Sequence, residues 1–309
     1  MERKVIILLG ATASGKTALS LQLAEHLNSE IISADSRQVY KLLDIGTAKP
    51  SKNILLRIKH HLIDFLEPWQ DYNASQFEKD ALSIIEELHK KGIIPIVAGG
   101  SGLYIQALVD GIFDSFTTDS EYRNYLEKLR IEFGNQFLYN QLKEVDPVTA
   151  SKLLPQNYKR VIRALEVFNI SGDPIWKHHN EFVREINIDF LQYGLNWSRE
   201  ILYDNINRRV DEMISAGFLD EVKTLLTNGY DLSYNSMNTV GYKELIHYLE
   251  GKISFNYAVE SMKKATRNYA KRQMTWFRKD KRIIWFDINS YDDIYRIRDL
   301  ILNDFLITL

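Results

Sequence analysis

Residues 10–17 read Gly10-Ala11-Thr12-Ala13-Ser14-Gly15-Lys16-Thr17 and match the phosphate-binding pattern G-x-x-x-x-G-K-[ST]. An apolar run, residues 5–9, precedes them, and a segment with helical periodicity, residues 18–27, follows. A loop between a strand and a helix presents successive backbone N–H groups and a helix N-terminus to an anion. The glycines fit because a residue without a Cβ lets the backbone turn sharply and approach the anion closely. The pattern therefore predicts a phosphate site on a parallel α/β sheet.

Each position of this loop has an expected role toward a bound phosphate. We expect backbone N–H groups to surround the phosphate oxygens, the Lys16 ammonium to contact them and the Thr17 hydroxyl to bind Mg²⁺. The phosphate-binding set is Gly10, Ala11, Thr12, Ala13, Ser14, Gly15, Lys16 and Thr17. The loop alone leaves open whether the phosphate belongs to ATP, GTP or another molecule.

Composition sets the size and charge of the protein. The chain has 309 residues, of which 45% are hydrophobic, so it has room for one domain with an insertion or for two domains. Residues 261–282 carry nine Lys or Arg and one acidic residue, a local charge of +8 in a chain whose net charge is −2. Such a basic segment favours contact with nucleic acid or polyphosphate, and the alternative is a solvated helix face.

Several classes of protein are excluded or disfavoured. The absence of cysteine excludes disulfides and thiolate zinc sites. No apolar run reaches the roughly 18 residues of a membrane-spanning helix, and residues 5–9 are too few for a secretory signal. We expect a cytoplasmic protein without a membrane partner, and a monomer.

Two further strand ends are expected beside the phosphate loop. Residues 30–34 predict a strand that ends at Asp35, and residues 93–98 predict one that ends before Ser101. Because parallel strands finish on one edge of a sheet, Lys16, Asp35 and Ser101 should converge on a single site. A shorter strand is expected within residues 61–65. The fold class is α/β, a P-loop NTPase-like parallel sheet flanked by helices.

An all-helical insertion is expected within this sheet. Residues 114–187 are rich in charges and aromatics and are broken by Pro and Gly, which leaves residues 1–113 and 188–309 as the catalytic core. Within the insertion, Val161, Leu165 and Phe168 mark the buried side of a helix.

The basic segment near the C-terminal end is also expected to be helical. Met262, Ala265, Tyr269 and Trp276 can share its apolar face, with the cations on the remaining surface.

Further motifs follow the loop in order along almost the whole chain. They are Asp35-Ser36-Arg37-Gln38-Val39-Tyr40, His60-His61-Leu62-Ile63-Asp64, Gly99-Gly100-Ser101-Gly102-Leu103-Tyr104, Arg160-Val161-Ile162-Arg163-Ala164-Leu165-Glu166, Gly241-Tyr242-Lys243-Glu244 and Thr266-Arg267-Asn268-Tyr269-Ala270-Lys271-Arg272-Gln273-Met274-Thr275-Trp276-Phe277-Arg278. Together with the loop, this set resembles the tRNA dimethylallyltransferase family. The chain lacks the zinc finger of eukaryotic members, so it resembles the bacterial type.

The resemblance implies a reaction and its partners. The family transfers the dimethylallyl group of dimethylallyl diphosphate to N6 of the adenosine 3′ of the anticodon, position 37, and releases diphosphate. The phosphates at the loop would then belong to the leaving group of a prenyl donor, with Mg²⁺ as the cofactor and the tRNA anticodon stem-loop as the acceptor.

The resemblance also implies catalytic residues. The exocyclic amine of adenine is a poor nucleophile, so a base that takes its proton assists the attack, and Asp35 matches this base. Lys16 and an arginine would stabilise the leaving diphosphate. The matching arginine is Arg209, with its neighbour Arg208 as the alternative. Ser101, where many members have threonine, would bind the amine or the ribose.

The target base must leave the stacked anticodon loop to react, and unstacked RNA bases are read by contacts of this kind. By resemblance, the tRNA-binding set is Asp35, Ser36, Arg37, Gln38, Ser101, Arg123, Lys159, Arg160, Val161, Ile162 and Arg163. For Arg123 and Lys159 the alternative is ordinary solvated surface.

Two other functions use the same features. A small-molecule or nucleotide kinase would bind ATP at the loop and an acceptor hydroxyl at Asp35. A catalytically silent tRNA-binding relative would bind RNA without reaction. The helical insertion and the motifs after the loop disfavour the kinase, and the complete set of Lys16, Thr17, Asp35 and a candidate arginine disfavours the silent relative.

Overall fold

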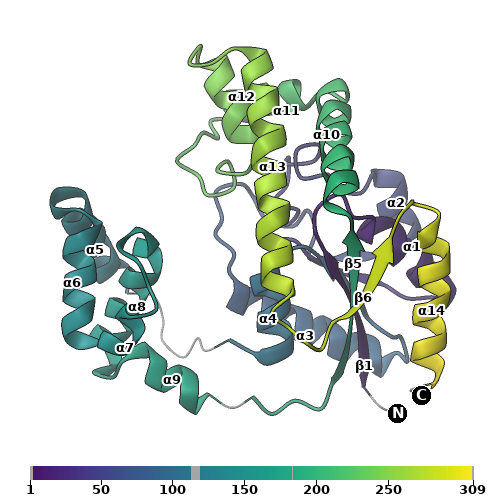
Figure 1. Ribbon diagram of the computed structural model, residues 1–309, viewed down its shortest axis with the longest axis horizontal. Coiled ribbons are helices and arrows are strands. Elements are labelled where there is room, and N and C mark those ends of the chain that lie inside the picture. The colour runs from purple at the N-terminus through teal and green to yellow at the C-terminus, as the bar shows by residue number, and fades with distance from the viewer. Residues whose placement is uncertain (1–2, 113–118, 183, 308–309) are drawn as a thin grey trace. The chain divides into compact units, whose positions relative to one another are not determined.

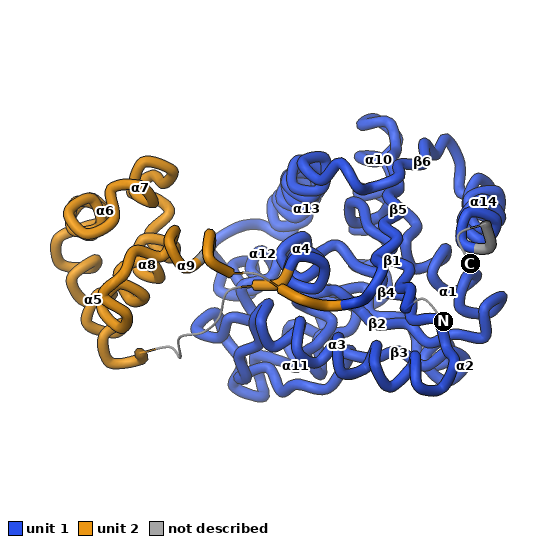
Figure 2. The backbone as a smooth tube through the Cα atoms, turned by 90° about the horizontal axis from the view of Figure 1, so that it is seen from below, with its two compact units in different colours: residues 1–110, 187–309 blue, residues 111–186 orange. Residues whose placement is uncertain are grey.

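The computed structural model describes residues 3–112, 119–182 and 184–307. The chain forms two compact units (Figure 2). Unit 1 comprises Met1–Asp110 and Asn187–Leu309, and unit 2 comprises Gly111–Ile186.

Unit 1 is built on a six-stranded parallel sheet of order β3-β2-β4-β1-β5-β6 (Figure 2). The strands are β1 (Lys4–Gly10), β2 (Ile31–Ala34), β3 (His60–His61), β4 (Ile96–Gly99), β5 (Asp189–Trp197) and β6 (Ile284–Ile288). Every residue of β1 is buried, as expected for a central parallel strand. Gly99 pairs in register with both Leu9 and Ala34, so β1, β2 and β4 finish level on one edge. The predicted parallel α/β sheet is confirmed.

Helices cover both faces of this sheet (Figures 1 and 2). One face carries α1 (Lys16–Leu27) and α14 (Asp293–Ile307), and the other carries α3 (Ala74–Lys90), α4 (Gly102–Asp110) and α13 (Phe255–Phe277). Ile6 and Leu8 of β1 belong to one buried cluster with Leu19 of α1 and Ile297 of α14. The remaining helices are α2 (Lys52–Arg57), α10 (Arg199–Ser215), α11 (Phe218–Thr227) and α12 (Tyr242–Leu249).

The prediction of a strand within residues 61–65 is wrong. β3 comprises only His60–His61, because the backbone turns immediately afterwards. Leu62 and Asp64 both have φ of 57°, a left-handed conformation that ends a strand. The Asp64 N–H instead donates to the carbonyl oxygen of Gln38 at 2.9 Å. The segment thus supports the turn that follows β2.

The described part of unit 2 contains only helices. They are α5 (Ser120–Phe133), α6 (Asn135–Val145), α7 (Pro147–Ala150), the short 3₁₀ helix η1 (Pro155–Asn157), α8 (Tyr158–Ser171) and α9 (Ile175–Glu181). Leu126, Leu138 and Leu142 pack with Val161 and Leu165 in its core. Phe168, expected on the same buried side, is only half-buried.

Candidate active site

The phosphate loop takes its shape from two glycines. Gly10 ends β1 with φ of +145°, and a Cβ there would lie 3.0 Å from the carbonyl oxygen of Leu195. Gly15 precedes α1 with φ of +92°, and a Cβ there would lie 2.8 Å from Cδ1 of Ile294. No side chain caps the N-terminus of α1, so its first N–H groups remain available to an anion.

Side chains from the second half of the chain hold this loop in place. The indole Nε1 of Trp197 donates to the Ser14 carbonyl oxygen at 3.0 Å, and the Tyr291 hydroxyl donates to that of Ala13 at 3.3 Å. Ala13 has φ of +60°, which costs energy for a residue with a Cβ. The surrounding structure therefore imposes the shape of the loop.

A cavity of about 90 Å³ lies against the loop at the carboxyl edge of the sheet. The residues that line it come from six separate segments: Thr12, Lys16, Thr17, Asp35, Gln38, Thr47, Ala98, Gly99, Gly100, Arg209, Tyr269 and Gln273. The structure thus brings the candidate phosphate contacts and the candidate base together. We refer to this space as the small cavity.

Lys16 is the main charged group of the small cavity. Its Nζ donates to the carbonyl oxygen of Ala11 at 2.6 Å. Burial, and then the positive charge of Arg209, lower the pKa of Lys16 to about 7, while the carboxylate of Asp35 acts in the opposite direction. An anion bound here would stabilise the ammonium form.

Arg209, and not Arg208, faces the small cavity. Nη1 of Arg209 donates to Oγ1 of Thr12 at 3.2 Å, and burial lowers the pKa of this guanidinium. Arg208 instead donates to Asn205, lies near Glu212 and is mostly exposed. The structure favours Arg209 over the alternative that the sequence left open.

Asp35 lies where β2 ends, and a turn holds its carboxylate. Oδ1 accepts from the Arg37 N–H at 2.8 Å. Asp35 also lines a second cavity, of about 330 Å³, together with the apolar side chains of Ile206, Val210 and Met213. We call it the large cavity. The same carboxylate therefore lines both the small cavity and the large cavity, which has apolar as well as polar side chains in its lining.

Ser101 is beside the small cavity but does not line it. Its hydroxyl accepts from the Ser36 N–H at 3.0 Å, next to Asp35. It lines an open groove of about 450 Å³ that also contains Arg37, Arg272 and the aromatic rings of Tyr40, Tyr72, Tyr104, Tyr269 and Trp276. The expected convergence of Lys16 and Asp35 on one cavity is confirmed, whereas Ser101 belongs to the adjacent groove.

Gln38 is engaged within the protein. Its Nε2 donates to the carbonyl oxygens of Thr47 and Ala48 at 3.2 and 3.1 Å, and its Oε1 accepts from the Ser33 hydroxyl at 3.2 Å. The amide therefore supports the loop that carries Thr47, and its contact with RNA stays a prediction.

Thr47 and Gln273 also line the small cavity, and the sequence patterns did not identify them as site residues. Thr47 follows a loop that is anchored by Glu221, whose Oε2 accepts from the Ile45 N–H at 2.6 Å and whose Oε1 accepts from the Tyr242 hydroxyl at 2.6 Å. Gln273 lies inside the motif at residues 266–278, but its hydrogen-bond partners Gly100 and Thr12 are 173 and 261 residues away. No local pattern shows contacts of that range.

The Mg²⁺ expected at Thr17 fits the residues present. The Thr17 hydroxyl group lines the small cavity, and the described residues contain no cluster of three or more His, Asp or Glu that would hold a metal on its own. Mg²⁺ is commonly held by one or two protein oxygens together with substrate phosphates. Thr17 would thus hold the ion jointly with a bound diphosphate.

In unit 2, one buried carboxylate orders two of the expected RNA contacts. Glu166 is fully buried, and its Oε2 accepts from Arg123 at 2.7 Å and from Arg163 at 2.9 Å. Lys159 and Arg160 are exposed. Glu166 therefore holds the guanidinium groups of Arg123 and Arg163 next to each other.

Val161 and Ile162 need a correction. Their side chains are 0% and 3% exposed in the core of unit 2, so these side chains are not available to RNA. Both residues lie on the side of α8 that packs into the core of unit 2 with Ala164 and Leu165, whereas Lys159 and Arg160 are exposed.

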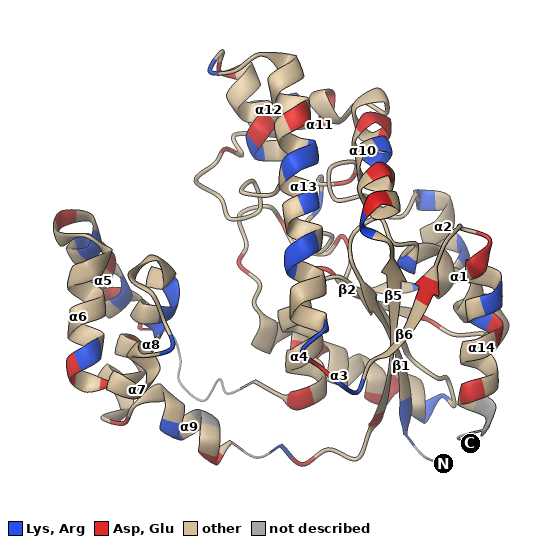
Figure 3. Cartoon of the chain, in the orientation of Figure 1, with Lys and Arg blue, Asp and Glu red and all other residues tan. Residues whose placement is uncertain are grey.

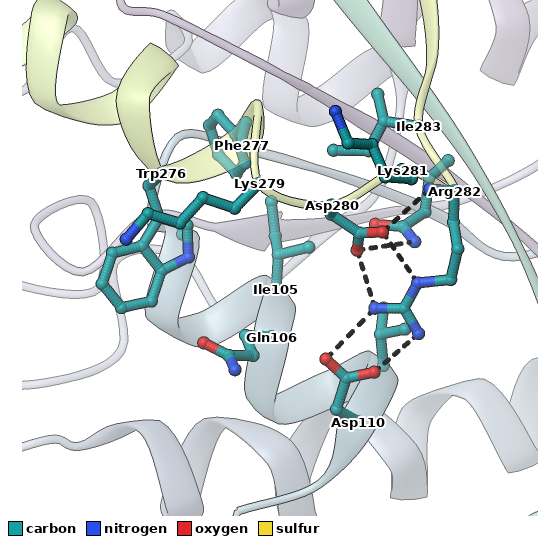
Figure 4. Close-up of a pocket in the computed structure, with 13 residues that line it drawn as sticks. Ile105, Gln106, Asp110, Trp276, Phe277, Lys279, Asp280, Lys281, Arg282 and Ile283 are labelled. Carbon is teal, nitrogen blue, oxygen red and sulfur yellow. Dashed lines mark hydrogen bonds and ion pairs between the residues drawn. The ribbon is translucent and has the colours of Figure 1, made fainter.

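The basic segment is partly structural. Lys and Arg recur along α13 (Figure 3), but Lys263 pairs with Asp211 at 2.8 Å. Arg282 bonds both Asp110 and Asp280 beside a cavity of about 410 Å³ (Figure 4). The buried positions of α13 are Ala258, Met262, Ala270, Gln273, Met274 and Phe277. Of the expected apolar face, Met262 is buried, whereas Ala265, Tyr269 and Trp276 are half-buried.

Comparisons with known proteins agree with this geometry. Residues 38–280 match the family model of the IPP transferases. The chain is 42% identical to the tRNA dimethylallyltransferase of Caldanaerobacter subterraneus, over 97% of this chain and 96% of that protein. It is 44% identical to that of Alkaliphilus oremlandii, over 99% and 98%.

Solved structures give the same result. The tRNA isopentenylpyrophosphate transferase of Bacillus halodurans is 37% identical, with a TM-score of 0.71 over 97% of this chain and 96% of that chain. A eukaryotic dimethylallyltransferase acting on tRNA is 31% identical, with a TM-score of 0.86 over 99% of this chain and 80% of that chain. Since the family model spans most of the sequence and these identities extend along nearly its whole length, the chain belongs to the IPP transferase family.

Proposed function

We propose that this protein transfers a dimethylallyl group from dimethylallyl diphosphate to N6 of adenosine 37 in tRNA. The observation that carries the proposal is the small cavity, in which Lys16 and Arg209 gather around the phosphate loop, while Asp35 lines both this cavity and the adjoining large cavity. Cationic groups that can stabilise a leaving phosphate, and a base that can accept a proton from an attacking amine, thus line the same small cavity.

In the proposed reaction, N6 of the adenine attacks C1 of the dimethylallyl group. A carbon–nitrogen bond forms, the carbon–oxygen bond to diphosphate breaks, and the electron pair of that bond leaves with the diphosphate. Asp35 accepts the proton that N6 loses. The turn that holds Oδ1 fixes the carboxylate before the substrate arrives.

Lys16, Arg209 and the N–H groups at the start of α1 would stabilise the charge that develops on the diphosphate. Mg²⁺, when bound at Thr17, would neutralise further charge on the same oxygens. The pKa of Lys16, about 7 in the free protein, would rise as the anion binds, so that the residue carries its proton during the reaction.

The large cavity suits the five-carbon chain. Its lining includes Ile206, Val210, Met213 and Phe218, and its volume is about 330 Å³. These apolar side chains would contact the hydrocarbon of the prenyl group.

Binding of tRNA would involve both units. In unit 1, Ser36, Arg37 and Ser101 line the open groove that contains the aromatic rings, where unstacked bases can be held. In unit 2, Lys159 and Arg160, with the Arg123 and Arg163 pair, would contact phosphates.

We propose that the protein acts as a monomer in the cytoplasm. In the described part of the chain, no helix has both the length and the apolar character to cross a lipid bilayer. Sedimentation of the purified protein tests the oligomeric state.

The function is tested by mass spectrometry of nucleosides from unmodified tRNA incubated with the protein, Mg²⁺ and dimethylallyl diphosphate. We expect an adenosine heavier by one five-carbon isoprenoid unit. Bound tRNA without this product would indicate a silent tRNA-binding protein. ATP-dependent phosphorylation of a small acceptor without prenyl transfer would indicate a kinase.

A further inference from the structure

Gln273 joins the two loops that form the small cavity. It lies in the last two turns of α13 and is 6% exposed. Its Oε1 accepts from the Thr12 N–H at 2.9 Å, and its Nε2 donates to the Gly100 carbonyl oxygen at 2.9 Å. One buried amide thus bonds the phosphate loop after β1 and the glycine-rich loop after β4.

Each end of this bridge continues into the site. On the phosphate side, Oγ1 of Thr12 accepts from Nη1 of Arg209 at 3.2 Å. On the other side, Gly100 precedes Ser101, whose hydroxyl accepts from the Ser36 N–H next to Asp35. A continuous set of contacts therefore runs from the candidate leaving-group arginine to the candidate base, and Gln273 is its centre.

The fit around the amide is close. A Cβ at Gly100 would lie 2.3 Å from Nε2 of Gln273, so a larger residue at 100 would displace the amide. A carboxamide is also the side-chain group of this length that both donates and accepts. A carboxylate of the same shape only accepts, and an apolar side chain does neither.

We propose that Gln273 is a positioning residue that keeps the phosphate loop and the glycine-rich loop in register, so that the leaving diphosphate and the attacking amine are held at reacting distance. The inference rests on the proposed function and adds to it a residue that does not itself touch the reacting atoms. Small errors in such alignment are costly, since a displacement of about 1 Å can lower a rate by about 10².

Two variants and a matched control test this. Gln273→Met keeps the approximate volume and removes both hydrogen bonds, and Gln273→Glu keeps the acceptor and removes the donor. Gln192→Met is the control, because Gln192 is also buried in unit 1, 3% exposed on β5, but does not line the small cavity. We expect both Gln273 variants to lose about 10- to 100-fold in single-turnover rate at saturating substrates. Their tRNA affinity should stay within about twofold of wild type, as should that of the control.

The pH profile separates positioning from general loss of structure. Below its pKa, the carboxyl group introduced by Gln273→Glu regains a hydrogen and can again both donate and accept. We therefore expect the rate of this variant, relative to wild type, to recover as the pH falls, whereas Gln273→Met shows no recovery. A relative rate of Gln273→Glu that does not change with pH would contradict the proposal.

Binding of inorganic diphosphate gives a readout that does not depend on prenyl transfer. Gln273→Met should bind it about five- to tenfold more weakly than wild type and Gln192→Met, because the loop is no longer held. Unchanged diphosphate affinity together with an unchanged rate would overturn the inference. Wild-type protein that transfers no prenyl group, while Gln273→Met still weakens diphosphate binding, would overturn the proposed function and leave the positioning role supported.

Discussion

The guanidinium of Arg209 lies beside the ammonium of Lys16 and contributes to the low pKa of that group, about 7. Two cations in one partly enclosed space repel each other and lose hydration, which favours an arriving polyanion that relieves both costs. This arrangement thus lowers the stability of the free protein and raises its affinity for diphosphate.

Replacing Lys16 with methionine should separate its effect on the stability of the free protein from its effect on diphosphate binding. Because the pKa of Lys16 is lower when folded than its usual 10.5, the unfolded chain binds more protons between pH 7 and 10.5, and folding stability rises across that range. We expect Lys16→Met to stabilise the protein by about 1–3 kcal/mol at pH 6 and to show a smaller gain at pH 9. Thermal unfolding at both pH values measures this, and a variant less stable than wild type at pH 6 would contradict it.

Diphosphate binding should be linked to proton uptake. At pH 8 most free protein has neutral Lys16, whereas the complex needs the ammonium, so binding takes up a proton and affinity falls as pH rises above about 7. Calorimetry with inorganic diphosphate in two buffers of different ionisation enthalpy measures the uptake. Lys16→Met is the control and should lack the part of the uptake due to this residue; equal uptake in both proteins would rule out the assignment.

The base assignment predicts a selective loss in Asp35→Asn. The amide keeps an oxygen that can accept from the Arg37 N–H, so the turn should persist, but it cannot take a proton from N6. We expect prenyl transfer to fall by about 10² or more while tRNA affinity changes little. Single-turnover assays and a tRNA-binding titration measure the two quantities, and an active variant would remove the assignment.

Substitutions of Arg209 and of its neighbour Arg208 test which arginine stabilises the leaving group. Arg209→Ala should lower turnover by about 10²- to 10³-fold, because a charge aimed at the leaving group is lost. Arg208→Ala should change it by less than about twofold, since that side chain contacts Asn205 and faces solvent. If the two effects were reversed in steady-state assays, the leaving-group role would pass to Arg208.

Glu166→Gln should affect tRNA binding through two arginines at once. The amide keeps one acceptor oxygen but carries no charge, so it holds Arg123 and Arg163 less firmly than the carboxylate does. We expect tRNA affinity to fall about three- to tenfold, with the single-turnover rate at saturating tRNA within about twofold of wild type. Arg130→Gln is a control, because it removes an ion pair on the same unit that does not involve Glu166. Equal affinity of Glu166→Gln and wild type would show that this pair does not meet RNA.

Much of the site could be predicted because its central part is local in sequence. The phosphate loop is eight consecutive residues, and the rule that parallel strands end on one edge places Asp35 near Lys16 without knowledge of the contacts. By contrast, the turn that ends β3 depends on positive φ at Leu62 and Asp64, which their residue types do not indicate.

One ambiguity could have been resolved from the sequence. Leu202, Ile206 and Val210 repeat every four residues on α10, and Arg209 falls seven residues after Leu202, on the same stripe. Arg208 lies off that stripe. The bonds of Gln273 could not be inferred in this way, because they join α13 to loops near the start of the chain.

The pairing of β1 has a consequence for synthesis on the ribosome. β1 pairs with β4, which is complete at residue 99, and with β5, which begins only at residue 189. While the ribosome synthesises unit 2, β1 therefore has one edge whose backbone N–H and C=O groups lack a partner strand. Such an edge is a site for aggregation and for chaperone binding. Nascent chains in which β5 has not yet left the ribosomal exit tunnel should thus depend on chaperones more than chains in which Asp189–Trp197 has emerged.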